Sequence, residues 1–121
     1  MCHNPKGIKH LIRLRLSFSH LREHKFKHGF LDTLNPFCDC DNDIESTNHF
    51  LLHCPNLVTE RNTFLSKIKS IDNNILHQTD SNICETLLFG NPTYNDLTNT
   101  DILNATIEYI LSSKRFDESL F

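Results

Sequence analysis

Long apolar stretches are missing from this chain of 121 residues. Hydrophobic residues make up 38% of it, and no run of them approaches the roughly 18 that a membrane-spanning helix requires. The N-terminal segment LIRLRLSF is interrupted by arginines, so it is unlike the apolar core of a secretion signal. The sequence therefore predicts no membrane association and a location in the nucleus or the cytoplasm, where thiols stay reduced.

Strand-like alternation, internal repeats and low-complexity tracts are also absent. Helical spacing recurs instead, which predicts one small all-α domain or a piece of a larger protein. Helices are expected at residues 5–21, 19–29, 46–54, 56–71, 80–90 and 98–116. Gly29 and Gly90 should end the second and fifth of them. Ser46 should cap the third, and Thr98 or Thr100 should cap the last.

Three of these helices carry an apolar stripe that should face a common core. The stripes are Ile8, Leu11, Ile12 and Leu16 in the first helix, Leu57, Val58, Phe64, Leu65, Ile68 and Ile71 in helix 56–71, and Ile102, Leu103, Ile107, Ile110 and Leu111 in the last. Arg61 falls on the second stripe. We expect its guanidinium to reach past an apolar stem into solvent or to pair with an acid such as Glu45.

Acidic residues are almost absent from residues 1–30, which hold seven Lys and Arg against Glu23 alone. Residues 31–121 hold five basic and fourteen acidic residues. The chain thus divides into a basic helical arm, 1–30, and an acidic helical body, 31–121. A basic arm is typical of a segment that binds an anion, although the two parts could also simply attract each other.

Three cysteines and two histidines are concentrated within residues 36–55, in a segment that is irregular from Asp32 to Glu45. Cys38, Cys40, His49 and Cys54 form a Cys₃His set, a common structural zinc shell. On an ideal helix, His49 and Cys54 would point about 140° apart. Pro55 pushes the residue before it out of the helical region, so Cys54 can turn back toward His49.

Other interpretations of the cysteines remain open. A disulfide between Cys38 and Cys40 would be strained, and a reducing compartment disfavours one with Cys54. His53 could replace Cys54 as the fourth ligand, which would leave Cys54 without a role. The cysteines could also simply be packed in the core.

Calcium binding is excluded although three alternate acids resemble the start of a calcium loop: Asp39, Asp41 and Asp43. The loop would need a glycine where Ile44 stands and an acid where Phe50 stands. Cys2 and Cys84 are isolated in the sequence, and we expect them to bind no metal.

The whole segment resembles the zinc-binding region near the C-terminus of reverse transcriptases from non-LTR (LINE-type) retrotransposons. That region has the pattern C-x-C-G … E-[ST]-x-x-H-x-L-x-x-C-P … R after an RLR … H helix. Its matches here are Cys38, Cys40, Glu45, Ser46, His49, Leu51, Cys54, Pro55 and Arg61. The segments LIRLRLSFSHLREHKFKHGFLDTLNPFC and ATIEYILSSKRFD are similar too, so the resemblance covers most of the chain. Asp41 departs from it, because the family usually has glycine there.

The resemblance implies a helical, zinc-knuckle-like module that holds Zn²⁺ and helps to bind template RNA or target DNA. Its partner would be the reverse transcriptase domain upstream in the same polyprotein. The chain has no paired-aspartate polymerase motif and no four-carboxylate ribonuclease H set. We therefore expect a non-catalytic, nucleic-acid-binding fragment, and as the alternative a zinc-stapled structural or protein-interaction domain.

The arm supplies the candidate nucleic-acid ligands: Arg13, Arg15, His20, Arg22, His24, Lys25, Lys27 and His28. Contacts from such a face to phosphates would be independent of sequence and sensitive to salt. His20, His24 and His28 recur every four residues and could instead bind a metal or form a polar, solvated face.

Overall fold

Helices form all of the named elements in the computed structural model, which describes residues 5–117. They are α1 (Pro5–Arg15), α2 (Arg22–Lys27), the π-helical turn η1 (His49–His53), the 3-10 turn η2 (Pro55–Leu57), α3 (Val58–Ile71), the 3-10 turn η3 (Asn73–His77), α4 (Asp80–Phe89) and α5 (Asp96–Ser113). Phe37 and Ile44 form an isolated antiparallel bridge, and residues 5–117 contain no strand. The all-α prediction is confirmed for this part of the chain, and none of its helices could cross a membrane.

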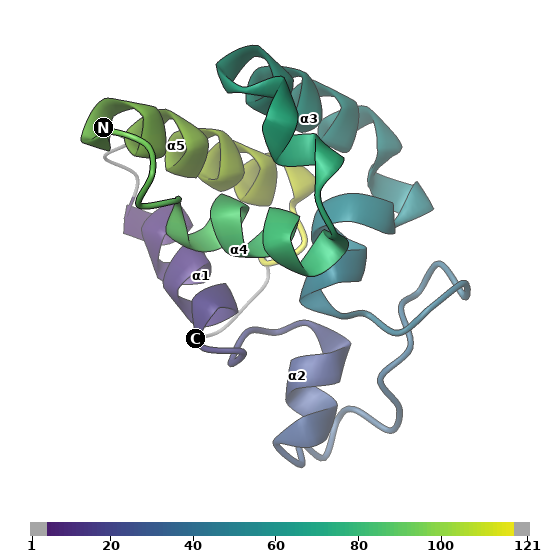
Figure 1. Ribbon diagram of the computed structural model, residues 1–121. Coiled ribbons are helices and arrows are strands. Elements are labelled where there is room, and N and C mark those ends of the chain that lie inside the picture. The colour runs from purple at the N-terminus through teal and green to yellow at the C-terminus, as the bar shows by residue number, and fades with distance from the viewer. Residues whose placement is uncertain (1–4, 118–121) are drawn as a thin grey trace.

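Helix α5 is the centre of the packing, with α1, α3 and α4 against it (Figure 1). Tyr109 of α5 is almost fully buried and stacks on Phe64 of α3, with 4.7 Å between the ring centroids. Phe50 lies 5.3 Å from the same tyrosine ring. These large rings join the turn that carries His49 to the two longest helices, so the core directly supports the histidine's position.

Helix α1 faces the core with a different stripe from the predicted one. Leu11 is buried as expected, but Leu14 is buried in place of Ile12 and Leu16, which are 45% and 70% exposed. Gly7 determines this rotation, because a Cβ there would collide with Ile107 of α5. The close contact between the α1 backbone at Gly7 and the Ile107 side chain thus overrides the apolar spacing.

Other boundaries also differ from the prediction. Helix α1 ends at Arg15 rather than near residue 21, because Ser17 adopts a positive φ of 54°. Val58 is 46% exposed, whereas Phe64 and Ile68 of the same stripe are buried. Asn95, not Thr98 or Thr100, caps α5, since its side chain accepts the Thr98 N–H. The turn η3 was not predicted.

Helix α2 and the irregular loop after it form one end of the molecule, beside the packed helices (Figure 1). Gly29 follows α2 with φ of 74°, and Gly90 follows α4 with the same value, so both predicted stops are confirmed. Residues 30–45 contain no helix, as expected from their sequence.

Candidate metal centre

The four side chains predicted to bind zinc lie close together where the loop of residues 30–45 meets the turn η1. The ligand atoms of Cys38, Cys40, His49 and Cys54 all lie within 4.8 Å of one another. The sulfurs of Cys38 and Cys54 are 3.7 Å apart, and Nε2 of His49 is 3.3 Å from the sulfur of Cys40. Three of the four side chains are buried and Cys40 is half-buried. The group could therefore hold a metal ion.

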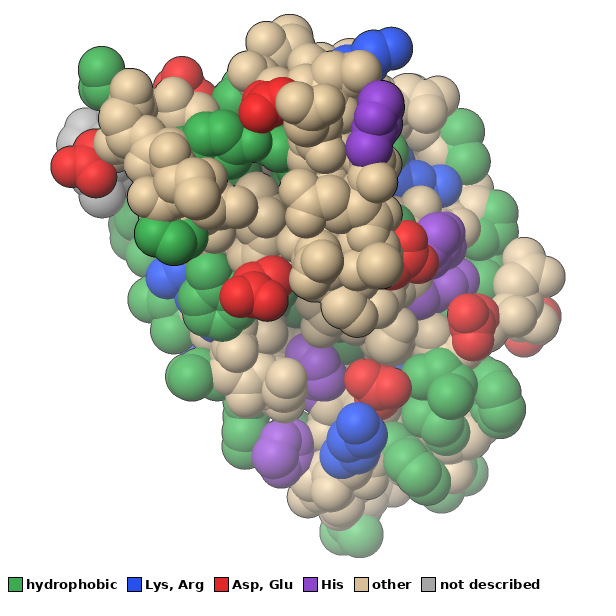
Figure 2. All heavy atoms as spheres, in the orientation of Figure 1, with side chains coloured by type: hydrophobic (Ala, Val, Ile, Leu, Met, Phe, Trp, Pro, Cys, Tyr) green, Lys and Arg blue, Asp and Glu red, His purple; other side chains and the backbone are tan. Residues whose placement is uncertain are grey.

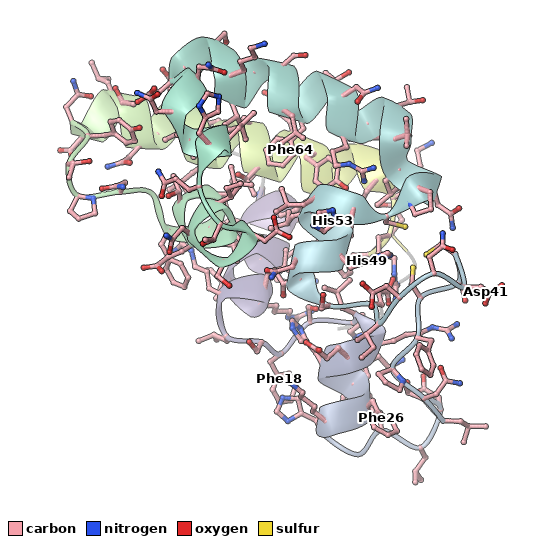
Figure 3. All side chains as sticks on the ribbon, turned by 45° about the vertical axis from the view of Figure 1, so that its right-hand side comes forward. Phe18, Phe26, Asp41, His49, His53 and Phe64 are labelled. Carbon is pink, nitrogen blue, oxygen red and sulfur yellow. The ribbon has the colours of Figure 1, made fainter. Side chains whose placement is uncertain are left out.

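A tight turn presents the first two ligands. The N–H of Asp41 donates to the carbonyl of Cys38 at 3.0 Å, and the N–H of Cys38 donates to the carbonyl of Asp43 at 2.9 Å. Asp41 has φ of 63°, which is the left-handed region. Glycine adopts this conformation without strain. The glycine of the reverse transcriptase pattern would therefore fit this position better than Asp41 does. Asp41 lies at the tip of the turn (Figure 3).

A π-helical turn presents the other two ligands. The N–H of Cys54 donates to the carbonyl of His49 at 2.8 Å, five residues back. Cys54 then becomes extended, with ψ of 120°, immediately before Pro55. The wide turn places residues five apart close together, and the proline holds Cys54 outside the helix as predicted. The π-helical turn itself was not predicted.

Two further contacts hold this turn in place. The hydroxyl of Ser46 accepts the N–H of His49 at 3.1 Å, as expected for a helix cap. Arg61 is buried, and its Nη1 donates to the carbonyl of Cys54 at 2.6 Å. Both predictions for Arg61, a solvent-exposed guanidinium and an ion pair with Glu45, were therefore wrong. Its charge stabilises the backbone of a ligand residue instead.

The spacing of the four donors fits tetrahedral zinc. Zn–S bonds of about 2.3 Å at tetrahedral angles place two sulfurs roughly 3.8 Å apart, and the Cys38–Cys54 distance is 3.7 Å. Thiolates with a neutral imidazole also match the chemical preference of this ion. One usual feature is missing, because Nδ1 of His49 is buried without a hydrogen-bond partner among the described residues.

Burial favours the neutral forms of Cys38 and His49. It raises the pKa of the Cys38 thiol to about 12, and the neighbouring Cys40 and Cys54 act on it as well. Burial also lowers the pKa of His49, so its imidazole is neutral and able to bind a metal at pH 7. Metal binding would have to displace a proton from Cys38, which makes affinity fall in acid.

The competing interpretations of the cysteines are not supported by the positions of these side chains. His53 lies outside the cluster, exposed, with its Nε2 2.6 Å from the Asp80 carboxylate. Cys38 and Cys54 are free thiols, and so is Cys84, which is buried in α4. Cys2 lies outside the described residues. Figure 3 shows His53 and His49 on the same turn.

Glu45 and Arg115 form a connection that the sequence did not reveal. Nε and Nη2 of Arg115 each donate to a carboxylate oxygen of Glu45 at 2.7 Å, and Nη2 also donates to the carbonyl of His20 at 2.9 Å. The same carboxylate accepts the backbone N–H of Arg22 at 2.7 Å. Glu45 thereby links the irregular loop of residues 30–45 (the metal loop), α2 and the segment after α5. Neither periodicity nor spacing could have identified this pair, which is 70 residues apart.

The predicted histidine row does not form a single surface. His24 is buried; Nδ1 accepts the N–H of Ser19 at 3.2 Å, and Nε2 lies 3.2 Å from the Thr47 hydroxyl. His28 is exposed and its Nε2 lies 3.2 Å from the carbonyl of Ser17. His20 borders a surface hollow together with Arg22, Lys25 and Arg115. Neither a shared metal nor one solvated face of histidines is therefore formed.

The predicted cations of the arm mostly have acidic or carbonyl partners. Within and after α2, the pairs are Arg22 with Asp39 at 2.6 Å, Lys25 with Asp32 at 2.6 Å and Lys27 with Glu23 at 3.9 Å. In α1, Arg15 donates to the carbonyl of Leu88 and lies over the ring of Phe89, while Arg13 is half-buried in the last turn. Helix α1 packs on α5, so only part of the basic segment is available to a ligand.

Comparison with known proteins gave no match to any family model, curated protein or solved structure.

Proposed function

We propose that the chain is a zinc-binding helical module in which the ion is structural. The convergence of Cys38, Cys40, His49 and Cys54 within 4.8 Å carries this proposal. Four protein ligands leave no coordination position for a substrate, which is typical of structural zinc sites. When bound, zinc would fix the loop against the turn η1, and these residues would supply the complete shell.

We further propose that the module binds RNA or DNA as a non-catalytic part of a LINE-type reverse transcriptase polyprotein. The ordered match from Cys38 to Arg61 supports the relationship, since several residues of the pattern have a local structural role. Arg61 holds the carbonyl of Cys54, and Asp41 adopts the conformation that suits the family's glycine. The upstream polymerase domain is its expected partner.

Cations near α2 supply the proposed phosphate contacts. Arg22 and Lys25 pair with Asp39 and Asp32, whose side chains are 78% and 65% exposed. Exposed ion pairs contribute only about 0–1 kcal/mol, so a phosphate could replace either carboxylate at little cost. Such contacts would bind nucleic acid without regard to sequence.

A protein-interaction role is the second candidate. It is favoured by Leu31 and Leu34, which are 97% and 88% exposed in the loop after α2. Figure 2 shows hydrophobic side chains gathered over this end of the molecule. Exposed apolar patches commonly mark interaction surfaces.

The salt dependence of oligonucleotide binding tests the nucleic-acid proposal. For the zinc-loaded chain, log K should fall with log[salt] with a slope of roughly −0.7 to −0.9 per phosphate contacted. Replacing Arg22, Lys25 and Lys27 together by alanine should flatten this slope by about two to three units for every sequence tested. The matched control replaces three cations elsewhere, Lys67, Lys69 and Lys114. Equal slopes for the parent and the α2 variant would exclude these phosphate contacts and favour the protein-interaction role.

A further inference from the structure

Two adjoining hollows lie between α2 and the metal loop. The first, of about 470 Å³, is bordered by His20, Arg22, Lys25 and Arg115. The second, of about 450 Å³, is bordered by Arg22, Asn35 and Phe37. Because Arg22, Asn35 and Asp39 border both, the hollows form one continuous depression.

The first hollow gathers cationic groups from separate parts of the chain. Arg22 and Lys25 come from α2, and Arg115 comes from the segment after α5. Arg115 is held by two hydrogen bonds to Glu45. Arg22 and Lys25 are each held by one exposed aspartate at the wall of the same hollow. A phosphate entering the hollow would therefore meet two cations whose present partners are easily displaced.

The second hollow offers an exposed aromatic ring. The side chain of Phe37 is 55% exposed, although its backbone is fixed by the bridge to Ile44 and by the adjacent ligand Cys38. A ring held on a fixed backbone loses little freedom when a flat group stacks on it. Stacking of a base on an aromatic side chain is tolerant of sequence.

We propose that this depression binds single-stranded nucleic acid, with a phosphate beside Arg22 and Lys25 and a base on Phe37. The inference rests on the proposed nucleic-acid function and adds the form of the ligand. In a duplex the base faces are covered by their neighbours, so only an unpaired strand can use both hollows. Bound zinc would support the site by holding the Phe37–Cys38 backbone.

Fluorescence anisotropy tests this site. It measures how the zinc-loaded chain binds labelled oligo(U), labelled oligo(dT) and a labelled duplex with the same number of phosphates. The variant Phe37→Leu keeps an apolar side chain but removes the stacking ring. It should weaken binding of both single strands about tenfold and leave the duplex unchanged. The control Phe89→Leu removes an equally exposed ring, 55%, from the far end of α4 and should change none of the three affinities.

Removal of a competing carboxylate gives a test in the opposite direction. Asp39→Asn frees Arg22 and should tighten single-strand binding about threefold at low salt. Asp101→Asn changes the net charge equally on an exposed site in α5 and should have a smaller effect. Zinc content must stay the same in each variant, because Asp39 lies between two ligands.

The outcomes separate the two proposals. If the parent chain binds no oligonucleotide, the proposed nucleic-acid function fails and the site fails with it. If the parent binds single strands and duplex alike, and Phe37→Leu weakens neither, the nucleotide site is overturned while the broader function stands. If Phe37→Leu changes only self-association in sedimentation, the surface binds protein and the nucleotide site is also overturned.

Discussion

Two parts of this molecule, a packed body formed by α1, α3, α4 and α5 and a metal loop of residues 30–45, are held together by different forces. In the body, Ile68, Ile102 and Leu87 are fully buried, and burial of such side chains contributes roughly 1.5–3 kcal/mol each. In residues 30–45, Leu31 and Leu34 are almost fully exposed, and turn hydrogen bonds with a few ion pairs remain. The body can therefore rely on its core, whereas the loop depends on the four ligands and on Glu45.

Loss of the metal should have the largest effect, and it should destabilise the metal loop much more than the packed body. Chelation, or Cys38→Ser, should abolish binding of about one zinc ion per chain and remove on the order of 10 kcal/mol of binding free energy. Amide exchange should accelerate across residues 32–55, while α3 and α5 keep part of their protection. Elemental analysis and hydrogen exchange measure the two effects.

Cys84→Ser is the matched control, because Cys84 is buried outside the cluster. It should retain the metal, as should His53→Ala. Retention of zinc by Cys54→Ser together with its loss in His53→Ala would show that the ligand set is wrong.

Breaking the ion pair between the two regions should have the next largest effect. Arg115→Met leaves the carboxylate of Glu45, whose side chain is 7% exposed, without its cation. Because the side chain of Arg115 is itself 31% exposed, the loss should be below the roughly 3–5 kcal/mol of a fully buried pair, at about 2–3 kcal/mol. Urea unfolding of the zinc-loaded chain measures this. Lys67→Met removes the exposed pair with Glu108 and should cost less than about 1 kcal/mol; equal losses would contradict a special role for Glu45.

Acid should weaken the contacts that His24 of α2 makes with Ser19 and Thr47. Burial, with smaller effects from Lys27 and His28, lowers its pKa to about 4 from 6.5. The folded-state pKa is the lower one, so stability is complete above pH 6.5 and is lost as the pH falls toward 4. At pH 5 the loss from this group is about 2 kcal/mol.

The variant His24→Asn keeps a hydrogen-bond acceptor near Ser19 but does not titrate in this range. Its free energy of unfolding should therefore change less between pH 7 and pH 5 than that of the parent. Metal release in acid affects both chains, so the difference between them is the measurement. Identical pH profiles would exclude His24 as the sensitive group.

The smallest expected effect is a gain in stability at the tip of the metal loop. Asp41→Gly relieves the strain of a positive φ and should stabilise the zinc-loaded chain by about 0.5–1 kcal/mol. Asp43→Gly should destabilise it, because Asp43 accepts the N–H of Ile44 and does not have a positive φ. Competition with a chelator and thermal unfolding compare the two; a shift in the same direction for both would contradict this account.

Local patterns made the helices and the clustering of the four candidate ligands predictable. The spacing of Cys38, Cys40, His49 and Cys54, with Pro55 after them, was sufficient because all of these residues lie within one short segment. The rotation of α1 was not predictable, since it follows from the contact of Gly7 with Ile107, a hundred residues away in sequence. Arg61 was misassigned for a similar reason: periodicity places a residue on a face but does not name its hydrogen-bond partner.

The Glu45–Arg115 link has a consequence for the order in which the protein forms during synthesis. The ligands from Cys38 to Cys54 emerge from the ribosome together, so the loop can capture its ion before the residues of α5 have emerged. Arg115 emerges much later, 70 residues after Glu45. A nascent chain would thus hold its metal before α5 can anchor the loop, and ribosome-bound chains halted before residue 115 should already retain zinc.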